Sequence, residues 1–115
     1  MVTLENTLLQ ITHNGMGQGD EALGLQLVTN YLKLIDETKK LPKFIAFYNS
    51  GVKLICTDSP IIEILSSIQA KGVKLIACKT CLNHFNMLAN VKVGMPGTMI
   101  DIIELQTASD KVINL

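Results

Sequence analysis

Two cysteines and a histidine share one short segment of the sequence. Cys78 and Cys81 lie three positions apart in "CKTC", and His84 follows Cys81 by another three. The apolar segment 72–78 predicts a buried strand, so Cys81 would lie in the first turn of the helix that follows. The free N–H groups and the dipole of a helix start favour a thiolate, which is the nucleophile in sulfur chemistry. With Lys79 and His84 adding positive charge, Cys81 is predicted to be a reactive thiol with a lowered pKa.

Other interpretations of this segment remain open. Cys78 closes the apolar strand, so it is either a small core residue or a second thiol that forms a disulfide with Cys81. The C-x-x-C spacing also occurs in thiol–disulfide redox proteins, although the buried cysteine comes first here. A zinc site built on Cys78, Cys81 and His84 needs a fourth ligand, and only Cys56 and His13 remain, neither in a paired spacing. We therefore expect no metal and no other cofactor. Cys56 and His13 are expected to be an inert core thiol and a hydrogen-bonding loop residue.

Three glycines precede a predicted helix. Gly15, Gly17 and Gly19 alternate with other residues in "NGMGQGD", and Asp20 can cap the helix that follows. A dinucleotide-binding loop needs the spacing G-x-G-x-x-G and an acidic residue after the next strand, and neither is present. The loop is therefore either a tight turn that needs glycine or, together with Asn14, a cradle for a small anion at the helix start.

The elements that must position these residues follow from the hydrophobic pattern. Five segments predict strands and alternate with helical patterns: 7–13, 43–49, 72–78, 90–94 and 110–115. This alternation predicts an α/β fold, a three-layer α/β/α sandwich with a five-stranded, mainly parallel sheet of Rossmann- or flavodoxin-like topology. A single domain over residues 1–115 is expected.

The loops that follow the strands should gather the candidate site. Ligands of parallel sheets bind beyond the carboxyl ends of the strands. Four loops are predicted to meet there, "HNGMGQGD", "YNSGVK", "ACKTC" and "GMPGT". Backbone N–H groups of the first two, including those of Asn49, Ser50 and Gly51, are expected to hydrogen-bond a thiolate or a small oxyanion near Cys81.

Helix boundaries can also be read from the sequence. The first helix should run from Asp20 towards Pro42, with one apolar stripe made by Leu23, Leu27, Tyr31 and Leu34. Ser59 and Pro60 predict the start of a second helix that ends before Gly72, and Thr98 with Asp101 predicts a capping box for the last one. Four methionines are expected to fill gaps in the packing: Met16, Met87, Met95 and Met99.

Composition limits the classes of function. The chain of 115 residues carries ten acidic and ten basic residues, and every basic residue is a lysine. Without a basic excess, arginine or many aromatic residues, nucleic-acid binding is disfavoured. Three cysteines and a start without a basic leader favour the cytoplasm, and no apolar run is long enough for a membrane span. The high hydrophobic content of 48%, with few charges (17%), predicts a homo-oligomer, a dimer or a trimer.

Three segments together resemble a known family. "NGMGQGDEALG", "FYNSGVKL" and "CKTCLNHF", in this order and spacing, are similar to the DsrE-like domain of YedF-type proteins, which are described as sulfurtransferases associated with selenium metabolism. The resemblance implies an α/β fold, homo- or hetero-oligomers and a sulfur relay in which a cysteine carries sulfur as a persulfide. Cys81 matches that cysteine better than Cys78 does.

The resemblance also suggests a partner. The longer YedF arrangement has a preceding TusA-like sulfur-carrier domain, which this sequence lacks, so the resemblance leaves two alternatives: the protein acts alone, or its relay partner is a separate TusA-like protein. Two kinds of function remain open at this point. One is a sulfurtransferase or persulfide carrier acting through Cys81, with Cys78 supporting or resolving. The other is a non-catalytic oligomeric module that binds a small ligand, or a thiol–disulfide redox protein that uses both cysteines.

Overall fold

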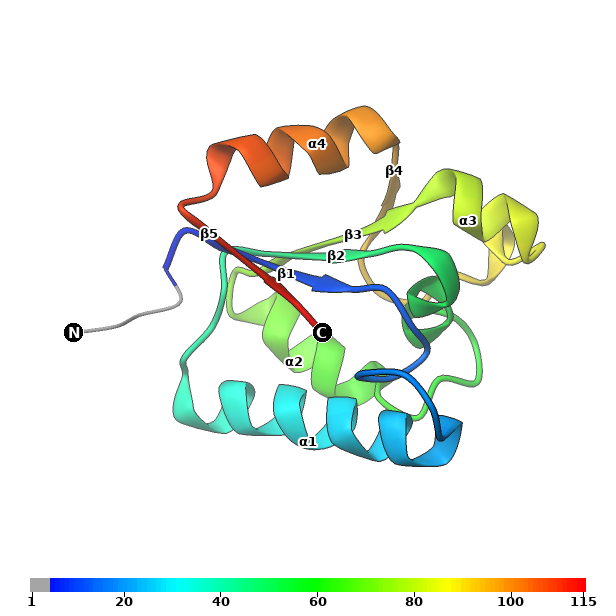
Figure 1. Ribbon diagram of the computed structural model, residues 1–115, viewed down its shortest axis with the longest axis horizontal. Helices are drawn as coiled ribbons and strands as arrows, with labels where there is room; N and C mark the ends of the chain where they lie inside the picture. Colours follow the sequence, from blue (N-terminus) through cyan, green and yellow to red (C-terminus); the bar gives the residue numbers. More distant parts are fainter. Residues whose placement is uncertain (1–4) are drawn as a thin grey trace.

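Alternating strands and helices fold into one parallel sheet with helices on both faces (Figure 1). The computed structural model describes residues 5–115, so the first four residues of the predicted domain lie outside it. The strand order is β4-β3-β2-β1-β5, and every neighbouring pair is parallel. The strands are β1 Thr7–Ile11, β2 Phe44–Phe47, β3 Lys74–Cys78, β4 Met95–Gly97 and β5 Lys111–Asn114. The prediction of a five-stranded parallel α/β sandwich is therefore confirmed.

The helices divide between the two faces of the sheet. They are α1 Glu21–Thr38, η1 Asn49–Ile55, α2 Ile62–Ala70, α3 Lys79–His84, η2 Leu88–Asn90 and α4 Met99–Ala108, where η denotes a 3₁₀ helix. In Figure 1, α1 and α2 lie below the sheet and α4 crosses above it, from β4 at one edge to β5 at the other. Because the chain returns to the other edge across the opposite face of the sheet, the crossovers on both faces stay right-handed.

Alternating side chains of the strands build two cores of unequal size. Leu9, Ile11, Ile45 and Phe47 pack with α1 and α2 in the larger core. The residues between them belong to the face under α4, where the smaller core consists of Leu8, Ala46, Cys78 and Ile102. Cys78 is therefore fixed in the packing of the sheet, at the end of a central strand.

Helix α1 starts where the sequence predicted and ends earlier. The carboxylate of Asp20 accepts a hydrogen bond from the backbone N–H of Leu23 at 2.8 Å, as an N-cap does. The helix ends at Thr38, because Lys39 adopts a left-handed conformation with φ +58°, before Pro42 is reached. Helix α2 begins at Ile62, two residues after Pro60, which is later than predicted. The capping box of Thr98 and Asp101 is present as predicted.

The apolar stripe predicted for α1 does not face the sheet. Leu23, Leu27 and Leu34 are exposed and Tyr31 is half-buried. The buried stripe is the neighbouring one, Gly24, Val28, Leu32 and Ile35. The helix therefore carries two adjacent apolar stripes, and only one of them is covered by the rest of the chain.

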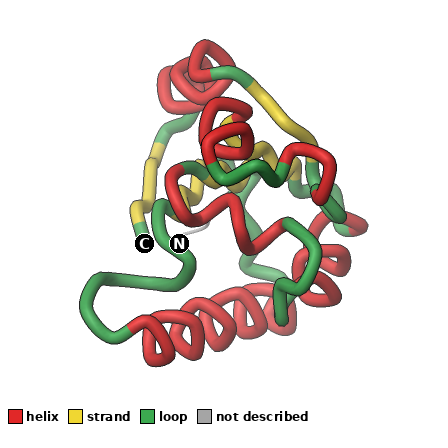
Figure 2. The backbone as a smooth tube through the Cα atoms, turned by 90° about the vertical axis from the view of Figure 1, so that its right-hand side faces the viewer, coloured by secondary structure: helices red, strands yellow, loops and turns green. Residues whose placement is uncertain are grey.

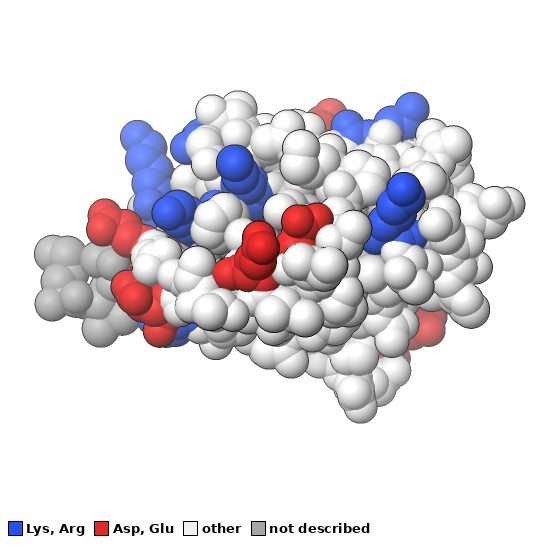
Figure 3. Space-filling model, turned by 90° about the horizontal axis from the view of Figure 1, so that it is seen from above, with Lys and Arg blue, Asp and Glu red and all other residues white. Residues whose placement is uncertain are grey.

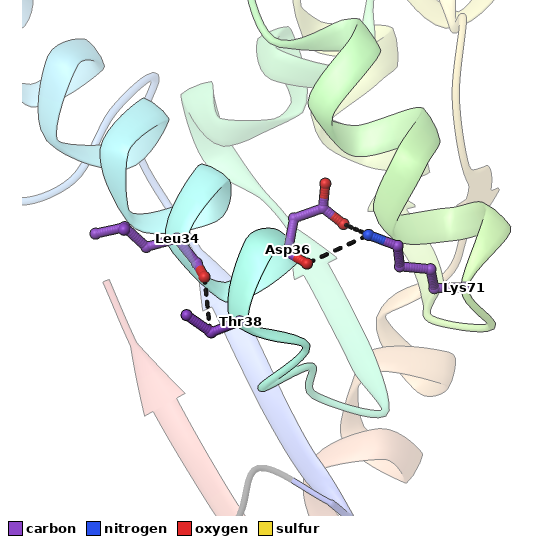
Figure 4. A network of polar contacts seen from close by, with 4 residues as sticks. All are labelled: Leu34, Asp36, Thr38 and Lys71. Carbon is purple, nitrogen blue, oxygen red and sulfur yellow. Dashed lines mark hydrogen bonds and ion pairs between the residues drawn. The ribbon is translucent and has the colours of Figure 1, made fainter.

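An ion pair ties α1 to α2 (Figure 4). The Lys71 ammonium lies 2.5 Å from the Asp36 carboxylate and donates to the Asp36 carbonyl oxygen at 3.2 Å. Lys71 holds the pKa of the Asp36 carboxyl below its ordinary value. In the same view the Leu34 side chain points away from α2. The exposed stripe thus lies on the side of α1 that is not packed against its neighbour.

The fourth strand differs most from expectation. Segment 90–94 was predicted as a strand, but it contains the end of η2 and an isolated bridge between Val91 and Cys56. The strand is Met95–Gly97, from the predicted "GMPGT" loop, paired with β3 at the sheet edge. Proline is tolerated there because an edge strand leaves one side unpaired. Within residues 5–115, no helix is both long and apolar enough to cross a membrane.

Candidate functional site

Three of the predicted loops meet at the carboxyl ends of the strands, which Figure 2 views directly. The glycine-rich loop leads into α1 on one side of the sheet, and α3 lies on the other side. The segment predicted as the loop "YNSGVK" is folded as the 3₁₀ helix η1 and lies between them. Two hydrogen bonds connect the three parts. Asn14 N–H donates to Ser50 Oγ at 3.1 Å, and Asn49 N–H donates to Cys81 Sγ at 3.0 Å.

Cys81 receives its hydrogen bond from a residue in an unusual conformation. Asn49, the first residue of η1, has φ +53°, and its side-chain oxygen accepts from the N–H of Ser50 at 2.9 Å. Left-handed backbone is uncommon for residues other than glycine, and asparagine is among those that tolerate it best. In this conformation the Asn49 N–H points at the sulfur atom. The predicted contact between the "YNSG" segment and Cys81 is thus present through one backbone donor.

The two cysteines occupy different environments. Cys78 is the N-cap residue of α3 and is 1% exposed, whereas Cys81, the third residue of α3, is partly exposed. Both thiols are free, and the Cys81 side chain packs against the small core that contains Cys78. A reagent from solution can therefore reach Cys81 but not Cys78. Cys78 can act only through Cys81.

Cys81 opens into a pocket of about 360 Å³, here called the Cys81 pocket. Its walls come from η1, α3 and the start of α4: Tyr48, Asn49, Thr80, His84, Phe85 and Met99. His84 and Phe85 meet edge to face, with ring centroids 5.1 Å apart. Met99 is 51% exposed and Met95 57% exposed, so these two methionines do not fill gaps in the core, contrary to the prediction.

The pKa of Cys81 moves opposite to the prediction. Burial raises the pKa of the Cys81 thiol, the Asn49 N–H lowers it, and the neighbouring Cys78 thiol raises it further. The net direction is upward because burial has the largest effect, with the sulfur lying against the core. Cys81 is therefore mainly a thiol at neutral pH. Burial likewise raises the pKa of Cys56, which is fully buried and donates to the Val52 carbonyl oxygen.

The two predicted cationic helpers are placed differently. His84 lines the Cys81 pocket, as its three-residue spacing from Cys81 implied. Lys79 is exposed and does not line the pocket. Among the described residues, no three His, Cys, Asp or Glu side chains are grouped so as to hold a metal ion.

The glycine-rich loop forms a separate pocket of about 260 Å³, here called the glycine-loop pocket. Its lining includes His13, Asn14, Gly15, Gly17 and Gly19, together with Ser50 and Lys53. The loop folds back on α1, where Met16 N–H donates to the Gly24 carbonyl oxygen at 2.9 Å. A Cβ atom on Gly15 would lie 2.6 Å from the Gly24 backbone, so this glycine is needed for packing. The loop does not line the Cys81 pocket.

Gly51 has a structural role as well. It is buried, and a Cβ atom there would lie 2.2 Å from the Ile11 carbonyl oxygen. Only glycine lets η1 approach β1 this closely. Gly51 thereby fixes the position of Asn49, two residues earlier, although it touches neither pocket.

Comparison with known families identifies the fold and its relatives. The family model described as the DsrE/DsrF-like family matches residues 8–115. The chain belongs to the DsrE/DsrF-like family. Among curated proteins, no match is found.

Solved structures agree with this DsrE-like assignment at the level of the fold. The YchN protein from E. coli has 19% identity and a TM-score of 0.70, covering 95% of this chain and 99% of that chain. MTH1491 from Methanobacterium thermoautotrophicum has 21% identity and a TM-score of 0.68, covering 95% and 97%. BT1422 from Bacteroides thetaiotaomicron has 16% identity and a TM-score of 0.64, covering 96% and 95%. MTH1491 and BT1422 are both described as proteins of unknown function.

One residue near the site of this DsrE-like chain was missed from the sequence. Lys53, on η1, lines the glycine-loop pocket and a third hollow of about 650 Å³, here called the Lys53 groove. Its ammonium lies 4.6 Å from the centroid of the Phe85 ring, which also lines the Cys81 pocket. The segment "YNSGVK" was predicted to be a loop. It forms the 3₁₀ helix η1, which carries both Asn49 and, four residues later, Lys53.

Proposed function

We propose that this DsrE-like protein is a sulfurtransferase that carries sulfur as a persulfide on Cys81. The observation that carries the proposal is the single accessible thiol in a pocket, held by the Asn49 N–H at 3.0 Å, at the carboxyl ends of the strands. The association of the family with sulfur relay supports it. The order of the "NGMGQGDEALG", "FYNSGVKL" and "CKTCLNHF" segments favours a YedF-type member.

The transfer step exchanges one sulfur–sulfur bond for another. The Cys81 thiolate attacks the outer sulfur of a donor persulfide, R–S–SH. A new bond forms between that sulfur and Cys81, the donor bond breaks, and the donor leaves as R–SH with the proton from Cys81. The reaction consumes no oxidant or reductant. A separate TusA-like sulfur carrier is the proposed acceptor in the next exchange.

The raised pKa of Cys81 is compatible with this chemistry. A protonated thiol is protected from unselective oxidation, while the thiolate that does form is a stronger nucleophile than one with a low pKa. The Asn49 N–H supplies a fixed donor to the sulfur that carries the negative charge in the attack. Such chemistry suits a reducing compartment, which is why we propose the cytoplasm.

Cys78 offers a second fate for the persulfide. Its thiol is next to Cys81 and hidden from solvent. Attack by Cys78 on Cys81 Sγ would form a disulfide between the two cysteines and release hydrogen sulfide. This route makes Cys78 a resolving thiol and defines the redox alternative for the site.

Sulfur loading of the intact protein tests the proposal. After incubation with a small persulfide donor, the parent should gain about 32 daltons, the mass of one sulfur atom. Cys81→Ser should gain none, whereas Cys56→Ala, the matched change at a buried thiol, should gain as much as the parent. If the parent takes up no sulfur from any donor, the ligand-binding alternative is favoured instead.

We also propose that the protein forms a homodimer through the exposed stripe of α1. Leu23, Leu27 and Leu34 offer uncovered apolar surface. Antiparallel packing of α1 on α1 of a second copy would place the acidic start of each helix, Asp20 and Glu21, beside the lysines that follow the end of the other, Lys39 and Lys40. Such self-complementarity is what a two-fold interface requires.

A further inference from the structure

Three hollows at the carboxyl ends of the strands are neighbours that share lining residues. Phe85 lines both the Cys81 pocket and the Lys53 groove, and Asn14 and Lys53 line both the Lys53 groove and the glycine-loop pocket. Cys81 therefore lies in the first of three neighbouring hollows, and Lys53 lines the other two. The volumes, about 360 Å³ and about 650 Å³ for the first two parts, are those of small-molecule sites.

A molecule bound at Cys81 can extend from the pocket in two directions. One leads over Met99 onto α4, where Met99, Ile100 and Ile103 are exposed and apolar. Figure 3 shows this face of the molecule, where uncharged surface lies between acidic and basic side chains. The other direction leads past Phe85 into the Lys53 groove, which is lined by polar side chains such as Asn86 and Asn90. A charged donor would extend in the second direction.

Lys53 supplies the positive charge in the Lys53 groove. Its side chain is half-buried, its ammonium is held over the Phe85 ring, and it makes no ion pair with a carboxylate among residues 5–115. A cation above an aromatic ring keeps its charge available for a further anion on the side away from the ring. Three carboxylates lie in the same hollows, Asp58 in the Lys53 groove and Asp20 and Glu21 in the glycine-loop pocket. These carboxylates repel an anion elsewhere in the hollows, so a bound anion must reach the Lys53 ammonium itself.

We infer that Lys53 binds a carboxylate of the sulfur donor, and that this donor is a small thiol persulfide with an anionic backbone. The inference rests on the proposed function, because it names the substrate class of the same site. The thiol end of the donor enters the Cys81 pocket, its backbone passes Phe85, and its carboxylate meets the Lys53 ammonium. In the transfer step the outer sulfur moves to Cys81 and the anionic thiol leaves along the Lys53 groove.

Protection from alkylation tests this without requiring sulfur transfer. S-methylglutathione, an anionic thioether that has no thiol and cannot transfer sulfur, should slow the reaction of Cys81 with iodoacetamide in the parent. Lys53→Gln should need about fivefold more of it for the same protection, the scale of one partly screened ion pair. Lys79→Gln is the matched control, since Lys79 is an exposed lysine that lines none of the three hollows, and it should behave like the parent.

A charge series extends the test to transfer. Glutathione persulfide should load Lys53→Gln and Lys53→Glu progressively more slowly than the parent, whereas the neutral persulfide of mercaptoethanol should load all three equally. Equal losses in Lys53→Gln and Lys79→Gln would overturn the inference, because they would indicate an effect of net charge. Protection that is unchanged in Lys53→Gln would also overturn it, even if Cys81 still takes up sulfur. Protection with no sulfur uptake from any donor would refute the proposed function alone.

Discussion

The backbone N–H of Asn49 donates to Sγ of Cys81 across 3.0 Å, although the two residues are 32 positions apart in the sequence. The donor belongs to a residue with φ +53°, so the contact depends on a left-handed backbone at the start of η1. Because the N–H lowers the pKa of Cys81 against the larger effect of burial, the conformation of Asn49 contributes to the reactivity of the thiol.

Substitution of Asn49 should therefore change Cys81 without touching it directly. Asn49→Gly keeps access to positive φ and should leave the Cys81 pKa close to that of the parent. Asn49→Val disfavours positive φ, so the N–H should turn away and the pKa should rise. The pH dependence of iodoacetamide labelling measures both variants. Equal profiles for Asn49→Gly and Asn49→Val would show that this hydrogen bond does not control the thiol.

The pH dependence of the parent follows from the direction of the Cys81 shift. Burial raises the pKa, so the rate of alkylation at Cys81 should still be rising above pH ~8.5, the ordinary value for a cysteine. The folded state holds its proton more tightly than the unfolded state, so the contribution to stability is present below the unfolded pKa and is lost as pH rises through the folded pKa. A labelling rate that levels off near neutral pH would contradict the raised pKa.

Gly51 should be needed for stability more than for ligand binding. A Cβ atom at 2.2 Å from the Ile11 carbonyl oxygen cannot be accommodated without moving η1 away from β1. Gly51→Ala should lower the free energy of unfolding by about 3 kcal/mol, the upper range for overpacking. Gly17→Ala is the control: its φ of +78° is strained for alanine, but nothing lies within 4 Å of the added carbon, so about 1 kcal/mol is expected. Urea denaturation compares them, and equal losses would argue against the close approach.

Much of this architecture could be predicted from the sequence because it depends on local patterns. Strands such as β3 are predicted by a continuous run of apolar residues. The capping box at Thr98 is predicted by two residue types at a fixed spacing. Strand β4 could not be found in this way. Met95–Gly97 has no strand pattern, and its extended form comes from pairing with β3.

Other features required knowledge of packing. Helix α1 has two apolar stripes, and the one predicted from the sequence is the exposed one. The stripe that contains Gly24 is buried because the glycine-rich loop must approach the helix there. The pKa of Cys81 was predicted in the wrong direction because sequence position reveals the helix start but not the depth of burial.

The predicted homodimer depends on the exposed stripe of α1. Light scattering at micromolar concentration should report a dimer for the parent. Leu27→Glu places a carboxylate in the middle of the proposed interface and should give a monomer. Lys33→Glu, at an exposed position outside the stripe, should remain dimeric. A monomeric parent would refute the dimer, and a trimer would refute the pairing of α1 with itself.

The most direct test of the central claim is to locate the sulfur. The parent and Cys78→Ala are loaded with a persulfide donor, trapped with an alkylating agent and digested, and the modified peptides are mapped by mass spectrometry. We predict that the additional sulfur lies on Cys81 in both proteins and is retained longer in Cys78→Ala, which lacks the resolving thiol. Sulfur found on Cys78 or Cys56 in the parent, or uptake that persists in Cys81→Ser, would contradict the account.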